Sequence, residues 1–407
     1  MSSGLQKIDL TSQGFKNDPI PVIRGSQKAG SLIRTKLPLI GKCYLTTTHA
    51  ATTDLLKGKD RFAMQPKNAG KRDLTWWFNF LPQSMRRLSK NMLTSDEPDH
   101  RRLRSLVDQA FHRQSLADLR SRVEELCDAY LDRLESANQD PVDFVSTVAR
   151  PFPLTVICEM LGIPEKDRPQ LMGVFEGMLK SNNLFELIRL LPKFKELTNY
   201  FEGLFETVRA NPGPGLISAL VHAEEDGDQL DKDELMTMVY LLFVAGHETT
   251  VHLLSGGLWA LEKFPEERER LRKAPAIIET GIDELLRFVS PVMITKPRFA
   301  KQDMEFHGTQ VRRGEMIIGF LAAANFDEAV FEDPEELNLS RKPNPHTSFG
   351  GGIHFCLGFQ LARMEGQILF TKLLERYPDV HLAIDPDDVL WYKRFGLRGL
   401  SELPVTV

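Results

Sequence analysis

Residues 349–358 read Phe349-Gly350-Gly351-Gly352-Ile353-His354-Phe355-Cys356-Leu357-Gly358, a glycine-rich turn that leads into a cysteine. The three glycines predict a tight turn whose backbone can lie close to a flat partner. A helical pattern starts near Cys356 and ends before Pro378, and N–H groups at a helix start favour a thiolate. A thiolate is the ligand that donates electron density to haem iron and promotes O–O cleavage. This stretch, the cysteine loop, therefore suggests a haem site.

Two other interpretations of the cysteine loop stay open on spacing alone. A glycine-rich turn before a helix can cradle a phosphate, although no clear parallel strand precedes this one and the chain lacks β-α-β alternation. A lone buried cysteine can also be an ordinary core residue.

Bulk composition describes an ordinary globular protein. The chain has 407 residues, 42% of them hydrophobic and 26% charged, with a net charge of -5 and a pI near 6.1. This balance argues against wholesale nucleic-acid binding, which favours a strongly basic surface. The polar residues 1–15 predict no signal peptide and no membrane anchor. The four cysteines form no zinc-type pair, which favours a reducing, cytoplasmic setting. We also expect a monomer.

The hydrophobic pattern predicts a mainly α fold with small β-sheets, organised as a single domain over residues 1–407. Helices are expected at 49–56, 98–111, 116–134, 145–161, 231–263 and 276–289, and from near residue 356 to before 378. Strands are expected at 43–46, 296–300, 304–306, 316–320 and in the C-terminal tail. Residues 62–92 look irregular and carry a cluster of aromatic side chains.

The cysteine loop resembles the haem-ligand loop of the cytochrome P450 family. The family pattern, Phe-Gly-x-Gly-x-His-x-Cys-x-Gly, is matched at every fixed position, and the resemblance extends from about residue 41 to the C-terminus. It implies the cytochrome P450 fold, a haem b cofactor and Cys356 as the axial ligand of the iron. It also implies that Phe349 packs beside the thiolate, that His354 reaches a haem propionate, and that Gly358 belongs to the same cofactor-binding set.

A second motif lies in the middle of the longest expected helix, where the chain reads Ala245-Gly246-His247-Glu248-Thr249-Thr250. Glycine and β-branched hydroxyl residues weaken a helix at one spot. Taken alone, the motif fits a crossing of small residues with an ion-paired glutamate. It also resembles the family's distal-helix motif, which implies that Thr249 holds oxygen and a water, that Glu248 feeds protons inward, and that Ala245 and Gly246 leave room for oxygen.

Glu284 and Arg287 stand three residues apart on an expected helix face. A surface pair of this kind would mean little, but its position resembles the family's Glu-x-x-Arg motif, which implies a buried structural ion pair. The family often adds a basic residue from a later segment. Here Glu336 takes that position, which leaves the third partner open, with Arg341 as a candidate.

Cations that could hold anionic haem carboxylates occur in two further segments. His100 and Arg104 stand four apart on one expected helix face, and Arg298 lies in Lys296-Pro297-Arg298-Phe299. The run that contains Arg101, Arg102 and Arg104 could instead be a solvated face. The resemblance implies that His100, Arg104 and Arg298 are propionate ligands.

The resemblance also implies a substrate pocket formed by segments that vary across the family. About half of the residues expected there fit equally well as ordinary core residues, because pockets and cores share composition. The pocket residues expected are Trp76, Trp77, Phe78, Phe185, Leu241, Val244, Val292, Ile294, Gly396 and Leu397. Segments 74–93 and 171–195 would act together as a lid.

The family implies a monooxygenase that uses O2 and takes electrons from NAD(P)H through a separate ferredoxin or flavodoxin and its reductase. Its substrate would be an apolar small molecule, such as a terpenoid, steroid, fatty acid or polyketide-like compound. Arg101, Arg102, Arg113 and Lys342 form a basic set to which an acidic donor could dock, or a merely solvated face. Two rivals remain: a non-catalytic haem or apolar-ligand binding protein on the same scaffold, and a helical nucleotide-binding protein.

Overall fold

The computed structural model describes residues 6–38, 40–71, 91–113, 116–137, 140–180, 191–225 and 227–407. The chain forms two compact units. Unit 1 contains Met1–Arg72, Cys127–Pro151 and Thr249–Val407, and unit 2 contains Asp73–Leu126 and Phe152–Glu248. The chain passes from unit 2 to unit 1 within one long helix, α12 (Lys232–Lys263).

The main β-sheet belongs to unit 1 and has six strands in the order β1-β2-β3-β11-β8-β4. β3 pairs in parallel with β11, with Tyr44 opposite Ile317, and β11 pairs antiparallel with β8. The strands are β1 (Gln6–Lys7), β2 (Leu32–Leu37), β3 (Gly41–Thr46), β4 (Phe62–Ala63), β8 (Arg298–Ala300) and β11 (Met316–Gly319). One smaller sheet pairs β9 (Met304–Phe306) with β10 (Thr309–Val311). In another, β13 (Pro404–Thr406) lies between β12 (His381–Leu382) and β5 (Val142–Asp143).

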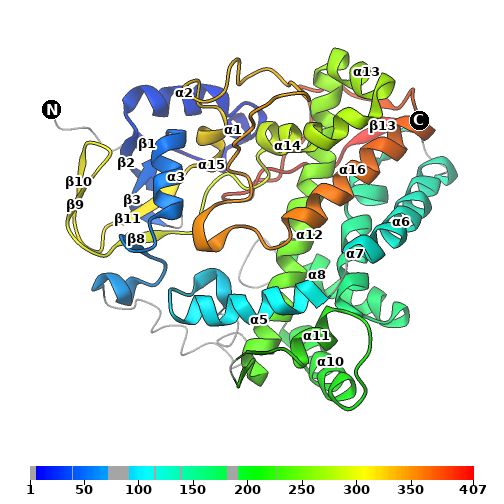
Figure 1. Ribbon diagram of the computed structural model, residues 1–407. Coiled ribbons are helices and arrows are strands. Elements are labelled where there is room, and N and C mark those ends of the chain that lie inside the picture. The colour runs from blue at the N-terminus through cyan, green and yellow to red at the C-terminus, as the bar shows by residue number, and fades with distance from the viewer. Residues whose placement is uncertain are drawn as a thin grey trace. The chain divides into compact units, whose positions relative to one another are not determined.

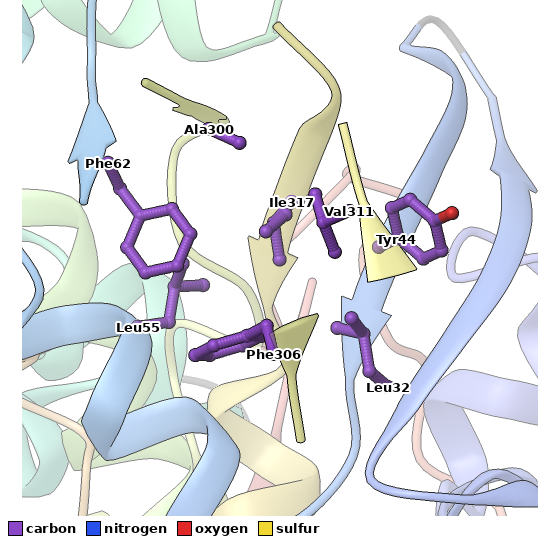
Figure 2. Packing of buried hydrophobic residues seen from close by; sticks show 8 residues of the cluster. All are labelled: Leu32, Tyr44, Leu55, Phe62, Ala300, Phe306, Val311 and Ile317. Atoms are coloured by element: carbon purple, nitrogen blue, oxygen red, sulfur yellow. The ribbon is translucent and has the colours of Figure 1, made fainter. Parts of the chain in front are cut away.

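One hydrophobic cluster fixes a helix against this sheet (Figures 1 and 2). Leu55 of α3 (His49–Lys57) is fully buried, as is Ile317 of β11, and both belong to a cluster with Phe62 and Phe306. Burial of each such side chain stabilises the fold by about 1.5–3 kcal/mol. The packing matters for the site because the next residue, Leu56, touches the cysteine loop.

Close helix packing in unit 1 depends on glycines. A Cβ at Gly257 of α12 would lie 2.5 Å from the Phe370 ring of α16 (Phe359–Arg376), and one at Gly366 would lie 2.3 Å from Ile282 of α14 (Ile278–Val289). The other helical segments of unit 1 are α1 (Gln13–Asn17), α2 (Ile20–Ala29), η1 (Pro66–Ala69), η4 (Val145–Ala149), α13 (Pro265–Lys273), η6 (Pro275–Ile277), α15 (Leu321–Asn325) and η7 (Gly352–His354).

Unit 2 is almost entirely helical in the part that the structure describes. Its elements are η3 (Met92–Thr94), α5 (Asp99–Arg113), α7 (Pro151–Leu161), η5 (Glu165–Asp167), α8 (Arg168–Lys180), α10 (Leu191–Ala210), α11 (Leu216–Val221) and the short strands β6 (Glu224–Glu225) and β7 (Asp228–Gln229). It shares α6 (Leu116–Ser136) and α12 with unit 1. None of the described helices is both long and apolar enough to cross a membrane.

The expected fold class is confirmed, and most expected helices differ from the observed ones by a few residues. Two boundaries were wrong. The helix expected at 145–161 is a π-helical turn followed by α7, which begins at Pro151, because proline has no N–H to continue the earlier helix. The helix expected from Cys356 begins at Phe359, with Gly358 as its N-cap.

Candidate active site

The cysteine loop has a backbone that requires its glycines. Gly350 and Gly352 adopt φ of 69° and 64°, the left-handed region that favours glycine. A Cβ at Gly352 would lie 2.3 Å from the Leu56 carbonyl oxygen. The Cys356 N–H donates to the Phe349 carbonyl at 2.9 Å, which closes the loop. Cys356 itself is half-buried and forms no disulfide with the other three cysteines. The short helical turn η7 precedes it instead of a strand, unlike a strand-to-helix phosphate loop.

Aromatic rings surround the base of the cysteine loop. The Phe349 ring is buried and lies 6.2 Å from Phe355 and 6.1 Å from Phe359. The Arg363 guanidinium lies over Phe349 and Phe359, 5.1 and 5.3 Å from the ring centroids, a favourable cation–π arrangement. Phe355 is 37% exposed, which is unusual for a large apolar side chain beside a structured loop.

An acidic residue holds Arg363 in place. Asp283 accepts hydrogen bonds from Arg363 Nε at 2.7 Å and from His346 Nε2 at 3.2 Å. The Ser348 N–H donates to His346 Nδ1 at 3.3 Å, so Nε2 carries the proton that faces Asp283. Burial would raise the pKa of Asp283, but the hydrogen bonds from His346 and Arg363 lower it overall. The carboxylate is therefore ionised and orients both the Arg363 guanidinium and the His346 ring.

Arg298 of β8 reaches the same point as the cysteine loop. The Arg298 side chain is buried, and its Nη1 donates to the carbonyls of Leu55 and Leu56 at 3.3 Å. Gly351 and Gly352 also contact Leu56. Within unit 1, the structure thus brings Arg298 close to the loop that carries the half-buried His354.

The carboxylate of Glu284 is the centre of a buried network. Arg287 Nε lies 2.8 Å from Glu284 Oε2, and Arg341 Nε lies 3.0 Å from the same oxygen. Arg341 thus supplies the third partner that the sequence left open. The basic side chain expected at position 336 is replaced by a backbone contact, since the Glu336 carbonyl accepts a hydrogen bond from Arg287 Nη2 at 3.1 Å. Asn344 Nδ2 adds a further bond to Glu284 at 3.1 Å.

A second polar network anchors the start of the cysteine loop, and sequence reasoning missed it. Asn325 Oδ1 accepts from the Thr347 N–H at 2.7 Å, and its Nδ2 donates to Ser348 Oγ at 3.0 Å. Ser348 Oγ in turn donates to the Leu286 carbonyl at 2.7 Å. The available signal was a single asparagine inside the apolar run 321–326, because a buried amide must find partners.

The distal motif lies on α12, as expected, and one face of this helix is unusual. Leu241, Val244, Ala245 and Glu248 recur at helical spacing, and Val244 is 37% exposed although most of α12 is buried. Gly246 lies against a neighbouring helix: a Cβ there would lie 2.9 Å from Ile157 Cδ1 of α7. Its missing side chain therefore permits helix packing, and Ala245 is the small residue on the exposed side. Thr249 follows, half-buried.

His100 and Arg104 lie on α5 in unit 2. His100 is buried, and burial followed by the charge of Arg104 lowers the pKa of its imidazole. A neutral imidazole can still donate one N–H to an anion. Arg104 Nε bonds both oxygens of Asp108 at 3.0 Å, so this arginine already has an acidic partner on its own helix.

The expected pocket residues of unit 1 gather in one place. Val292 and Leu397 form an antiparallel bridge, and the Met293 N–H donates to the Gly396 carbonyl at 2.9 Å. A Cβ at Gly396 would lie 3.0 Å from Ile294 Cγ1. Trp76, Trp77, Phe78 and Phe185, with most of the expected lid, lie outside the described residues.

The basic set needs a correction at Arg102. This residue forms ion pairs with Glu234 and with Asp228, the latter at 3.3 Å. It is therefore not the free cation that donor docking would need. Arg101 pairs only loosely with Glu97, at 3.2 Å, and stays 72% exposed.

A family model described as Cytochrome P450 matches residues 26–382 of the chain. The chain belongs to this family. It is 40% identical over 397 residues to the "Polyketide biosynthesis cytochrome P450 PksS" of Bacillus subtilis, covering 97% of this chain and 96% of that protein. It is 35% identical to the "6-deoxyerythronolide B hydroxylase" of Saccharopolyspora erythraea, over 80% of each chain. The solved structure of the Bacillus subtilis PksS protein matches with a TM-score of 0.88 and 38% identity, over 97% of this chain and 98% of that one.

The protein is thus a cytochrome P450 monooxygenase, and its family implies a haem-iron cofactor and the use of O2. The residues present fit such a group. Haem is flat and apolar, takes a soft thiolate on its iron, and carries two carboxylates. Within unit 1, the cysteine loop offers a half-buried thiol beside the exposed Phe355 ring, and Arg298 is a buried cationic side chain close to this loop.

Proposed function

We propose that this cytochrome P450 oxidises an apolar small molecule, by hydroxylation or epoxidation, and that Cys356 binds haem b through its thiolate. When bound, the haem would supply the redox chemistry: O2 is reduced with two electrons and two protons, one oxygen atom enters the substrate, and the other leaves as water. The observation that carries the proposal is the cysteine loop, whose positive-φ glycines and closing hydrogen bond present the Cys356 thiol at its end.

The polar residues of the proposed site would orient the cofactor. Arg298, His354, His100 and Arg104 would bind its carboxylates, because charged and N–H donors favour anionic partners. Arg104 would then share its guanidinium with Asp108, which holds Nε. Phe349 would pack beside the thiolate, and Gly358, the N-cap of α16, would keep that flank free of a side chain.

Glu248 and Thr249 would move protons. The Thr249 hydroxyl can accept a hydrogen bond from one group while it donates to another, so it can hold a water in a fixed place. Glu248 would take protons from solvent and pass them to that water. Ala245, which is small and exposed on the same helix, would leave room for O2. The presence of this acid–hydroxyl pair favours catalysis over a haem or ligand carrier on the same scaffold.

Polyketide-like molecules are the first substrates to test, since two similar proteins carry names that refer to polyketide biosynthesis and to 6-deoxyerythronolide B. Terpenoids, steroids and fatty acids come next. Leu241, Val244, Val292, Ile294, Gly396 and Leu397 would contact the substrate, with Trp76, Trp77, Phe78 and Phe185. Electrons would come from NAD(P)H through a ferredoxin or flavodoxin and its reductase, to a cytoplasmic monomer whose four cysteines form no disulfide.

The test is spectroscopic. Purified protein is reduced and treated with carbon monoxide, and a red-shifted Soret band is expected from thiolate ligation. Polyketide lactones, steroids and fatty acids are then added to the oxidised protein, and the class that shifts the Soret band is assayed for product with a ferredoxin, its reductase and NAD(P)H. A protein that shows the band and binds these ligands but forms no product with any electron donor would favour the carrier instead.

A further inference from the structure

Lys16 is an uncommon residue: a lysine at the end of α1 whose side chain is fully buried. Its Nζ donates to the Arg394 carbonyl at 3.0 Å and to the Leu397 carbonyl, and it lies 3.7 Å from Met293 Sδ. No carboxylate forms an ion pair with it in the part of the chain that the structure describes. A buried ammonium is costly unless it is hydrogen-bonded, so these two carbonyls are its stabilising partners.

Both carbonyls belong to the turn that carries two expected pocket residues. Gly396 and Leu397 pair with the segment around Met293 through the Met293–Gly396 hydrogen bond and the Val292–Leu397 bridge. Lys16 therefore donates hydrogen bonds to the backbone of the turn that forms the proposed pocket wall. Lys16 and this turn both lie outside the residues 26–382 that the family model matches.

The far end of the same turn is held by rigid packing. The Arg398 guanidinium packs against both Trp259 and Trp391, 5.1 and 4.1 Å from their ring centroids. A Cβ at Gly399 would lie 1.8 Å from His252 Nδ1 of α12. Arg398 Nε also donates to the Lys16 carbonyl at 3.1 Å. Packing thus holds residues 398–399, and the Lys16 ammonium is the side-chain donor that bonds residues 394–397.

We propose that Lys16 is a positioning residue that holds the pocket wall at Gly396 and Leu397 and so helps to determine which apolar substrates fit. This inference rests on the proposed function of these two residues as pocket wall. A lysine amine can donate these bonds with or without its charge, but burial disfavours the charged form, so the contact is most stable when Lys16 is neutral.

The charges around Lys16 make this contact sensitive to pH. Burial, and then Arg398, lower the pKa of Lys16 to about 7, while Asp9 acts in the opposite direction. Asp18 acts on Arg398 rather than on Lys16 directly. His252 and Tyr392 are the titratable groups at the far end of the turn, 6.3 Å apart between ring centroids.

The experiment compares two ligands of different size on the haem-loaded protein. Imidazole ligates iron without reaching the pocket wall, whereas 4-phenylimidazole adds a ring that must fit against it. Lys16→Met should weaken 4-phenylimidazole binding about tenfold, as expected for loss of hydrogen bonds to buried carbonyls, and leave imidazole binding unchanged. Lys28→Met, the same substitution at an exposed lysine of α2, should change neither.

Two further measurements keep the test decisive. Amide hydrogen exchange at Met293 and Arg398, whose N–H groups pair across this turn, should be faster in Lys16→Met than in Lys28→Met, and this readout needs no haem. In the wild type, with both affinities expressed per concentration of neutral ligand, the affinity ratio of 4-phenylimidazole to imidazole should rise as the pH rises through about 7. This measurement tests the proposal even if the variant does not fold.

Unchanged exchange, equal weakening of both ligands, or a ratio that does not vary with pH would each overturn the role of Lys16. A wild type that binds no haem, or haem without imidazole, would instead count against the proposed function. Faster exchange at Met293 and Arg398 with unaltered 4-phenylimidazole affinity would show that Lys16 holds the turn but does not shape the pocket, and would likewise overturn the inference.

Discussion

Arg287 Nε and Glu284 Oε2 lie 2.8 Å apart on α14, and neither side chain has any exposed surface. A buried pair of this kind is costly to break, because one charge is then left without compensation. Glu284→Gln leaves Arg287 and Arg341 without their shared carboxylate. We expect the free energy of unfolding to fall by about 3–5 kcal/mol, measured by urea denaturation.

Glu279→Gln is the matched control for this experiment, because Glu279 lies on the same helix and is exposed. Its effect should stay within about 0.5 kcal/mol, as is usual for surface substitutions. Equal effects of the two substitutions would mean that the buried network contributes little to stability.

Cys356→Ala removes the thiol at the end of the cysteine loop. The loop backbone should persist, because its hydrogen bond uses the Cys356 N–H and not the side chain. The reduced, carbon monoxide-treated variant should lack the red-shifted Soret band, since only a thiolate ligand produces the strong electron donation behind it. Cys158→Ala, at a fully buried cysteine of α7, should retain the band. A band that survives in Cys356→Ala would remove this residue from the iron.

The sequence predicted the parts of this protein that depend on local pattern. The cysteine loop, α12 and the Glu284–Arg287 spacing are recognisable because each function needs fixed residue types at short separation. The Asn325 network and the Lys16 contact were missed because their partners lie far apart in the sequence. Lys16 meets Leu397 across 381 positions, and such pairing depends on tertiary packing that periodicity does not report. The ion pair of Arg102 could not be predicted for the same reason, because its partner Glu234 lies on a different helix.

Thr249→Ala tests the proton path on α12. Without the hydroxyl, a water beside Ala245 and Glu248 would no longer be held in place, and proton delivery by positioned groups is worth about 10²-fold or more in rate. We expect substrate binding to be retained and product formed per NAD(P)H to fall sharply, with peroxide released in its place. Thr249→Ser, which keeps the hydroxyl, should recover much of the coupling. Wild-type coupling in Thr249→Ala would exclude the residue from proton delivery.

Glu365 of α16 should make the fold less stable as pH rises. The residue is 1% exposed, its Oε2 has no hydrogen-bond partner among the described residues, and burial raises the pKa of its carboxyl well above 4.5. Above that ordinary value the unfolded chain loses a proton that the folded chain keeps, so the free energy of unfolding falls with rising pH. Glu365→Gln should abolish this fall, whereas Glu375→Gln, at an exposed position of α16, should not.

Lys16 should produce the opposite slope in a different range. Burial, followed by the charge of Arg398, lowers the pKa of its amine from 10.5 to about 7. Between these values the folded chain has released a proton that the unfolded chain still binds, so the free energy of unfolding rises as pH increases through this window. In Lys16→Met this rise should disappear, while Lys28→Met should keep it. Urea denaturation at several pH values gives the free energy of unfolding of both variants. The difference between the two variants at each pH removes the contribution of every group that titrates in both. Parallel curves would mean that Lys16 titrates alike in the folded and unfolded chains, and that its burial carries no penalty for the charge.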